Sequence, residues 1–191
     1  MKPTELLRIL SVAEKLKCNT RHCSTSSGRQ ESVAEHSWRT ALMAMLTANA
    51  FPEANMEKVI RMCLIHDLGE AFTGDIPSFD KTETDSENEE KVLRQWVQTF
   101  PSPEREEWLA LYDEMEAQQT QEARIYKALD KLEAVIQHDE SDISTWLPLE
   151  YELQLEYGRE NVQFSSYLQR LKAEIDMITR EKIMLHHSET K

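Results

Sequence analysis

The sequence has few of the residues that interrupt helices, with only four glycines and six prolines among 191 residues. It also lacks any alternating polar and apolar stretch long enough to predict a β-strand. Leucine, alanine, glutamate, methionine and glutamine are abundant instead, and these residues favour helix. We therefore predict an all-α fold.

Cysteines and long apolar runs are scarce as well. The three cysteines are too few and odd in number for a disulfide framework. Cys18, His22 and Cys23 lie close together, but the second pair that would complete a zinc site there is missing. The longest apolar run, ALMAML, is far too short to cross a membrane, and we find no signal peptide. We therefore expect a cytoplasmic protein without a membrane partner.

Basic residues are outnumbered, because the chain has 35 acidic and 22 basic residues and a formal net charge of −13. Proteins hold nucleic acids and anionic membranes through lysine and arginine, so this balance argues against both as partners. It is compatible with one small phosphorylated ligand, since one or two local cations suffice to hold it.

The spacing of apolar residues divides the chain into helices. It predicts helices over about 4–17, 33–50 and 55–72, and a C-terminal group over about 148–185. The polar stretch 18–31 is expected to be irregular. We find no repeat and no linker, so residues 1–191 read as a single domain, a compact bundle of six or more helices.

The helix over 33–50 begins at the capping box Ser32-Val33-Ala34-Glu35, which brings His36 into its opening turns. The side chain of His36 lies on the apolar side of this helix, together with those of Val33, Ala41 and Ala44.

The helix over 55–72 carries three ionisable side chains within its apolar arc: His66, Asp67 and Glu70. Burying an uncompensated polar group costs roughly 2–7 kcal/mol, and a charge costs more. A divalent cation would satisfy these groups, with His36 as a further ligand. A single buried histidine is more often an ordinary core residue, so the residues alone leave both interpretations open.

Three stretches together resemble a known family. EHS at 35–37, IHDLGEAFTGDIP at 65–77 and KALDKLE at 127–133 resemble the H…HD…D pattern of the HD-domain metal-dependent phosphohydrolases. They are most similar to the 5′-deoxynucleotidase branch, which includes the HD-domain-containing protein 2 group. The resemblance covers about residues 4–140, the expected metal-site core, and implies an all-α fold, one divalent metal ion and a homodimer.

The resemblance also implies roles for individual residues. The metal ligands would be His36, His66, Asp67 and Asp130, the catalytic residues would be Glu70 and Asp75, and the substrate-binding residues would be Arg21, His22 and Asp75. Arginine suits phosphate because its planar guanidinium donates two hydrogen bonds. Deoxyribose-selective nucleotidases have a tryptophan at the position of His22, so the sugar preference stays open.

Helical periodicity disagrees with the resemblance at Asp130. On a helical wheel Asp130 lies opposite Leu129, Leu132 and Ile136, so periodicity predicts an exposed side chain. Its assignment as a metal ligand therefore comes from the resemblance.

Two imidazoles and two carboxylates suit one divalent transition metal, namely Mn, Co, Ni, Fe or Zn. We therefore predict a 5′-nucleotidase that hydrolyses (deoxy)nucleoside 5′-monophosphates to nucleoside and phosphate. The alternatives are hydrolysis of another small phosphoester, such as a guanosine tetraphosphate, and a catalytically idle metal- or nucleotide-binding regulatory module. Dinuclear HD enzymes need additional histidines before the last aspartate, and residues 68–129 contain none.

Overall fold

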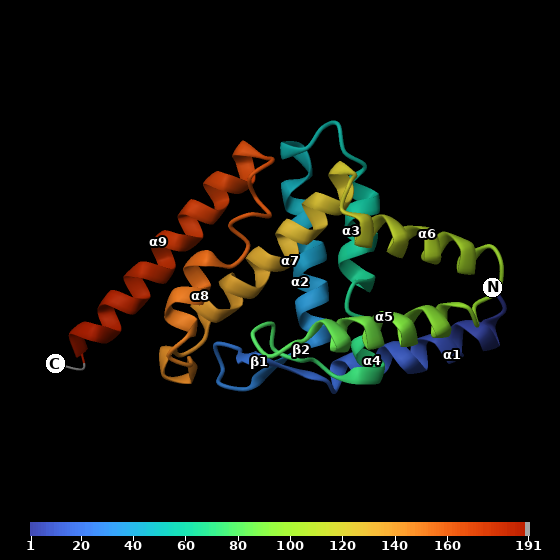
Figure 1. The fold of residues 1–191 in the computed structure, drawn as a ribbon, viewed down its shortest axis with the longest axis horizontal. Helices are drawn as coiled ribbons and strands as arrows, with labels where there is room; N and C mark the ends of the chain where they lie inside the picture. Colours follow the sequence, from blue (N-terminus) through green and yellow to red (C-terminus); the bar gives the residue numbers. More distant parts are fainter. Residues whose placement is uncertain (190–191) are drawn as a thin grey trace.

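Three helices form the centre of the protein in the computed structural model, which describes residues 1–189 (Figure 1). They are α2 (Val33–Thr47), α3 (Met56–Ile65) and α7 (Gln121–Glu140), and each packs against the other two. Their facing sides supply most of the fully buried apolar side chains. The all-α prediction is confirmed, and the predicted helix over 33–50 corresponds to α2 and the short 3-10 helix η2 (Ala48–Ala50) that continues it.

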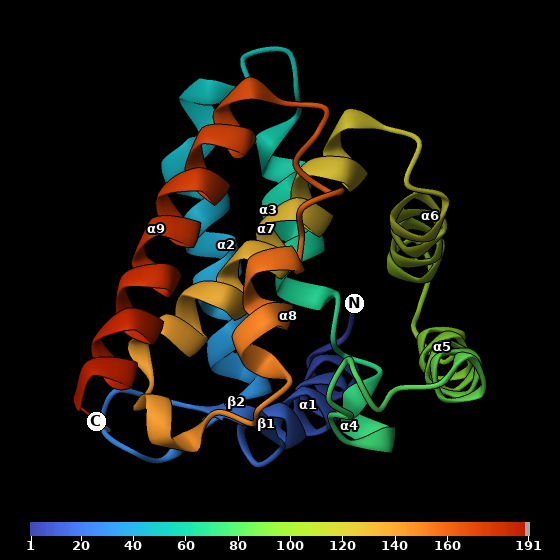
Figure 2. The same cartoon turned by 60° about the vertical axis from the view of Figure 1, so that its left-hand side comes forward.

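The remaining helices cover this centre on two sides. On one side lie α5 and α6, on the other α8 and α9 (Figure 2); α6 and α9 both pack against α7. The bounds are α1 (Pro3–Ala13), η1 (Glu14–Lys17), α4 (Glu70–Thr73), α5 (Glu83–Val97), α6 (Glu104–Ala117), η3 (Ile143–Thr145), α8 (Glu150–Glu156) and α9 (Ser166–Glu189).

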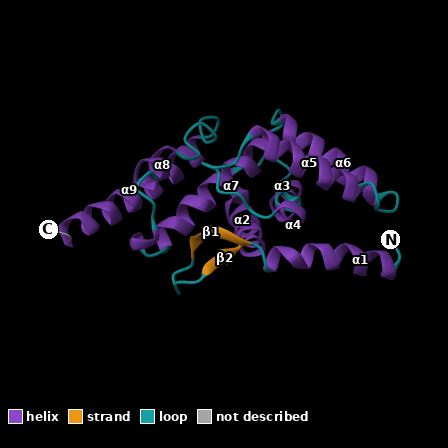
Figure 3. Cartoon of the chain, turned by 60° about the horizontal axis from the view of Figure 1, so that its bottom comes forward, coloured by secondary structure: helices purple, strands orange, loops and turns teal. Residues whose placement is uncertain are grey.

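The polar stretch after the first helix forms a small antiparallel hairpin, so the prediction that it is irregular is wrong. Its strands are β1 (Thr20–Ser24) and β2 (Gln30–Ser32), which lie beside the start of α2 (Figure 3). Gly28 provides the positive φ of 85° in the turn between them. Both strands are short and mostly polar, so they show none of the apolar alternation by which a strand is recognised.

The predicted helix over 55–72 is interrupted, because α3 ends at Ile65 and the short α4 begins only at Glu70. In the turn between them, amides bond to carbonyls three residues back rather than four. The carbonyl of Ile65, which accepts a hydrogen bond from the amide of Leu68, accepts a second one of 2.8 Å from the hydroxyl of Tyr112 on α6. The buried tyrosine thus satisfies the helix end that precedes His66.

Asp130 lies inside the protein with 8% of its surface exposed, so the exposure that periodicity predicts is wrong. The reason is the central position of α7, which is covered by α2, α3, α6 and α9. A helix covered on several sides has no single solvent-facing stripe.

The predicted C-terminal group of helices corresponds to α8 and α9, and α9 packs against both α7 and α8. That residues 1–191 form a single domain stays a prediction, and its last two residues lie outside the described part of the chain. Within the described residues, no helix combines the length and the apolar character needed to span a membrane.

Candidate metal centre

His36 is placed by the beginning of α2. Ser32 Oγ accepts a hydrogen bond from the amide of Glu35, and the carboxylate of Glu35 accepts one from the amide of Ser32, as the capping box predicts. The fixed first turn directs the imidazole of His36 toward α3 and α7, where it is completely buried. The capping box, which can be recognised in the sequence, therefore fixes the position of the His36 side chain.

The four predicted metal ligands converge. His36 Nε2 lies 3.2 Å from His66 Nε2 and 3.1 Å from Asp130 Oδ1. His66 Nε2 lies 3.2 Å from Asp67 Oδ2 and 3.4 Å from Asp130 Oδ1. His66 and Asp67 follow α3 directly, so the end of that helix brings both toward α7.

The protonation of the two histidines tests whether this group fits a cation. His36 Nδ1 contacts a carboxylate oxygen of Glu133, and His66 Nδ1 lies 2.8 Å from the carbonyl oxygen of Cys63. A ring that keeps its proton on Nδ1 turns the lone pair of Nε2 toward the two carboxylates, which is the orientation in which a histidine ligates a metal ion. Two imidazole nitrogens and two carboxylate oxygens in such close contact need positive charge between them, and a divalent metal ion supplies it, so the residues fit such an ion.

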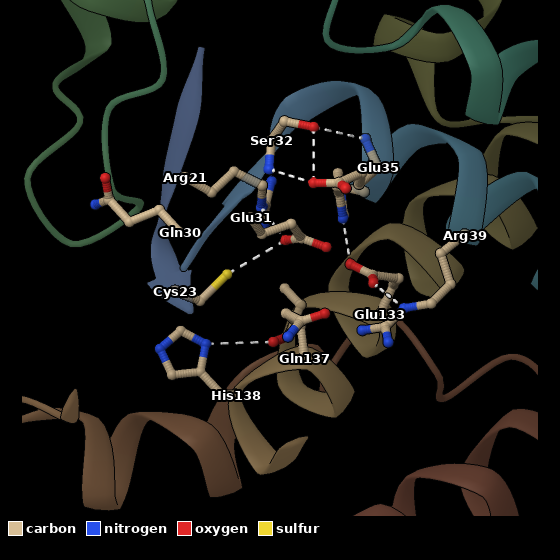
Figure 4. Close-up of polar contacts among 12 residues, drawn as sticks. Arg21, Cys23, Gln30, Glu31, Ser32, Glu35, Arg39, Glu133, Gln137 and His138 are labelled. Atoms are coloured by element: carbon tan, nitrogen blue, oxygen red, sulfur yellow. Dashed lines mark hydrogen bonds and ion pairs between the residues drawn. The ribbon is translucent and has the colours of Figure 1, made fainter. Parts of the chain in front are cut away.

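Glu133 supports the ring of His36, and the half-buried Arg39 holds Glu133 in turn. Figure 4 shows the contact between Glu133 and Arg39. Glu133 is completely buried, and its second oxygen accepts a hydrogen bond of 2.5 Å from Arg39 Nε. A carboxylate on the far nitrogen of a ligating histidine orients the ring and raises its basicity. Sequence reasoning missed this role, although Glu133 lies within the KALDKLE stretch, three residues and so one helical turn after Asp130.

Asp130 is held in its ionised form. Burial acts to raise its pKa, but the charges of Lys127 and Lys131 and the adjacent rings of the two histidines outweigh burial and hold the pKa well below its usual range. Lys127 Nζ donates to Asp130 Oδ2 at 2.9 Å. This environment keeps the negative charge that a metal ligand needs.

Glu70 is in the opposite situation. Burial, followed by the negative charges of Asp67, Asp75 and Glu89, raises its pKa to about 10. The side chain is 5% exposed, and among the described residues its Oε2 has no hydrogen-bond partner. A buried acceptor without a partner is costly, so this oxygen is available to a molecule that enters the site.

Asp75 reaches the same site through a turn. Gly74 ends α4 with a φ of 79°, a conformation that suits glycine, and the following residue lines the same cavity as Glu70. Burial raises the pKa of Asp75 above its ordinary value. The structure thus brings both predicted catalytic carboxylates beside the candidate metal ligands.

Arg21 and His22, on β1, form another side of this cavity, whose volume is about 160 Å³. Arg21 Nε lies 3.1 Å from Glu31 Oε2, and Arg21 Nη1 lies 3.9 Å from Asp67 Oδ2. The ring of His22 packs edge to face against that of Phe79, with centroids 5.6 Å apart. The unforeseen hairpin therefore places two of the three predicted substrate-binding residues, Arg21 and His22, in the wall of the cavity beside the candidate metal centre.

The C-terminal part of the chain closes the cavity, which sequence reasoning did not anticipate because it confined the site to about 4–140. Glu150, Leu153 and Gln154 of α8 and the following Tyr157 line the cavity, and Lys131 Nζ donates to the Tyr157 hydroxyl at 2.6 Å. The sequence of α8 contains no recognisable catalytic motif, so its contribution to the cavity is seen only in the folded structure.

A sequence model of the HD domain matches residues 13–172. The chain belongs to the HD domain family. Mouse 5′-deoxynucleotidase HDDC2 is 34% identical to this HD protein over 139 residues, which are 71% of this chain and 69% of the mouse protein. Human 5′-deoxynucleotidase HDDC2 is also 34% identical, over 114 residues that cover 59% of this chain and only 55% of the human protein.

Solved structures agree with this membership. A protein from Magnetospirillum magnetotacticum described as a predicted metal-dependent phosphohydrolase superimposes on this HD protein with a TM-score of 0.79 and 29% identity, over 95% of this chain and 92% of that one. The HD phosphohydrolase DatZ of cyanophage S-2L, solved with dA and one catalytic Zn²⁺ ion, shares the fold with a TM-score of 0.56 and 22% identity, over 100% of this chain and 96% of that one.

Proposed function

We propose that this HD protein is a divalent-metal-dependent phosphohydrolase that converts (deoxy)nucleoside 5′-monophosphates to nucleoside and phosphate. The observation that carries the proposal is the cavity itself. It joins a four-donor metal centre to a buried carboxylate oxygen without a partner, that of Glu70, and to a guanidinium, that of Arg21. The 5′-deoxynucleotidase names of the relatives support the substrate class.

His36, His66, Asp67 and Asp130 would hold one divalent ion: Mn, Co, Ni, Fe or Zn. Two imidazoles and two carboxylates bind all of these metals, so the donor set is compatible with each. When bound, the ion supplies positive charge that polarises the phosphoryl group and lowers the pKa of water. Glu133 and Arg39 keep the ring of His36 in the orientation that this site requires.

Glu70 is the group that orients the attacking water and takes its proton, in the ionised form that the positive charge of a bound ion would favour against burial and the neighbouring carboxylates. Its unpartnered Oε2 is a buried acceptor in the cavity wall to which such a water can bind. Asp75, on the next turn of the chain, positions the sugar or delivers a proton to the leaving 5′ oxygen. The two carboxylates thus divide proton transfer between the two sides of the phosphoester.

Arg21 binds the phosphate and steadies its charge. Its guanidinium is held by Glu31 and approaches Asp67, so it enters the cavity already oriented. His22 follows it on β1 and contacts the sugar or base side of the substrate, next to Phe79. In a protein of net charge −13, Arg21 makes the cavity acceptable to a phosphate together with Lys81, Lys127 and Lys131, which also line it.

We also propose that the protein is a cytoplasmic homodimer, as the resemblance to the nucleotidases implies. Exposed leucines on α1, namely Leu6, Leu7 and Leu10, provide apolar surface for such an interface. Sedimentation of the purified protein measures the oligomeric state directly.

The proposal is tested by stripping the protein with a chelator, restoring Mn²⁺, Co²⁺, Ni²⁺ or Zn²⁺ singly, and measuring phosphate release. The substrates are 5′-mono-, di- and triphosphates of ribo- and deoxyribonucleosides. We expect release from monophosphates that depends on the metal. General base catalysis contributes about 10²–10⁴-fold, so we expect the Glu70→Gln variant to lose about that factor while it still binds metal.

Glu57→Gln is the matched control, since Glu57 is an exposed carboxylate near the start of α3. It should retain full activity. Phosphate release from larger phosphoesters alone would contradict the proposal that the substrates are nucleoside 5′-monophosphates. Tight metal binding without turnover of any substrate would refute the enzymatic function and favour a regulatory module.

A further inference from the structure

A second group of metal-binding side chains lies in the cavity wall, apart from the centre described above. His22 comes from β1, His138 from the last turns of α7 and Glu150 from the first residue of α8. Glu150 Oε1 lies 2.9 Å from His138 Nε2 and 3.3 Å from His22 Nε2. The three donor atoms all lie within 4.8 Å of one another. Neither the predicted ligand set nor the proposed catalytic steps use His138 or Glu150.

His138 has an acceptor at each ring nitrogen. Its Nδ1 lies 3.3 Å from the carbonyl oxygen of Ala134, one helical turn earlier, while its Nε2 faces Glu150 Oε1. When the Nδ1–H is donated to Ala134, the lone pair of Nε2 faces the carboxylate, which is the orientation in which a histidine ligates a metal ion. A cation placed between the two residues would accept that lone pair together with the carboxylate oxygen.

Glu150 is fixed in place as a donor. Its side chain is 1% exposed, and its second oxygen accepts a hydrogen bond of 2.6 Å from the amide of Leu147. The first oxygen therefore points toward the two histidines with little freedom. A rigid carboxylate and two imidazoles on three separate elements form a prearranged donor set, which lowers the cost of binding an ion.

We propose that His22, His138 and Glu150 form a second transition-metal site, which binds Zn²⁺, Co²⁺ or Ni²⁺. Two imidazole nitrogens and one carboxylate oxygen are a donor set that zinc uses when one position stays open. Because all three residues line the cavity, water or an anion from it would complete the coordination of a bound ion. The site ties β1, α7 and α8 together around the cavity.

Occupation of this site also engages His22, which the proposed function assigns to substrate binding. Excess metal then occupies the cavity wall beside the substrate and slows turnover. This consequence rests on the proposed function, whereas metal binding does not.

The binding test uses untagged full-length protein, equilibrium dialysis against Zn²⁺, and metal analysis of the protein. We expect two zinc ions per chain in the unmodified protein, one in His138→Gln, one in Asp130→Asn and none in the double variant. The matched control replaces both C-terminal histidines, His186→Gln and His187→Gln, and should still bind two.

A second measurement uses stability. Zinc should raise the Tm of the Asp130→Asn variant, in which only the proposed second site is intact, and should not raise that of the double variant. Equal zinc content in the unmodified protein and in His138→Gln would overturn the proposal, and so would a zinc-dependent Tm in the double variant. If Asp130→Asn fails to fold, the difference in zinc content between the unmodified protein and His138→Gln still tests the second site.

Activity provides a separate readout. Excess Zn²⁺ should inhibit the unmodified protein but not His138→Gln. If no nucleotide is hydrolysed at all, the proposed function fails, yet dialysis still tests the second site.

Discussion

Two stretches of α7 treat their acids in opposite ways. In the middle of the helix, Asp130 and Glu133 are surrounded by positive charge, since Lys127 bonds to Asp130 and Arg39 bonds to Glu133. Near the C-terminal end, the half-buried Asp139 accepts a hydrogen bond of 2.9 Å from the hydroxyl of Thr179, and among the described residues its Oδ1 has no hydrogen-bond partner.

The pKa values follow this difference. Despite burial, the pKa of Asp130 is held well below its usual range by Lys127, Lys131 and the two histidines. Burial raises the pKa of Asp139, in contrast, to about 6. Burial alone favours the neutral acid, and nearby cations or hydrogen bonds to the charged form reverse that preference. The middle of the helix thus keeps its acids charged, as a metal site requires, whereas the C-terminal end carries an acid whose ionisation lowers stability.

The largest effect is expected from Asp130→Asn. The amide keeps the size of the side chain but removes the charge that a divalent ligand set needs, so phosphate release should fall to the level of the chelator-stripped protein. Phosphate release and metal content measure the two losses. Asp139→Asn makes the same substitution on the same helix and should leave both unchanged. Full activity of Asp130→Asn would contradict the assignment of Asp130 as a ligand.

A smaller loss is expected from Glu133→Gln. The glutamine oxygen can still accept the Nδ1–H of His36, but without a negative charge, and removal of such a supporting carboxylate typically costs about 10–100-fold in metal affinity or activity. Competition of each variant with a metal-binding dye measures the affinity. Glu140→Gln is the control, because it removes the other carboxylate that Arg39 contacts, one that is exposed. Equal weakening in both variants would assign the effect to Arg39 rather than to His36.

The smallest effect, and one of opposite sign, is expected from Asp139→Asn. Because the pKa of Asp139 is about 6 in the folded protein and about 3.8 ordinarily, the folded state binds the proton more tightly. Its stability therefore falls as pH rises from about 3.8 through about 6. The asparagine variant should be more stable at neutral pH, by about 1 kcal/mol once solvent screening is allowed for.

Thermal unfolding across pH measures this gain, which corresponds to roughly 2–4 °C in Tm for a chain of this size. The gain should be present at pH 7 and vanish below about pH 4, where both states are protonated. A gain that does not change with pH would show that packing, and not ionisation, is responsible.

Local signals made part of this protein predictable. The capping box at Ser32 predicts the start of α2 and therefore the inward position of His36. The polar side chains of His66, Asp67 and Glu70 in an apolar arc predict a buried polar group, which a divalent cation would satisfy, and the three side chains lie close to the same cavity in the structure. These inferences succeed because they depend on neighbours a few residues apart.

Other features depend on distant contacts and could not be read in this way. Tyr112 on α6 stabilises the end of α3, which a continuous apolar pattern concealed. The hairpin that aligns Arg21 has no apolar alternation, because its side chains find polar partners such as Glu31. The pairing of Glu133 with His36 joins residues on separate helices.

By itself, the sequence determined the helical class, the beginning of α2 and the types of side chain that meet at the metal centre, because propensity, capping and composition act over short distances. The tertiary structure alone decided that Asp130 lies inside, that α8 closes the cavity, and that His138 and Glu150 meet His22. The physical reason is that burial and charge pairing depend on which helices cover a surface, and covering helices are contributed by remote parts of the chain.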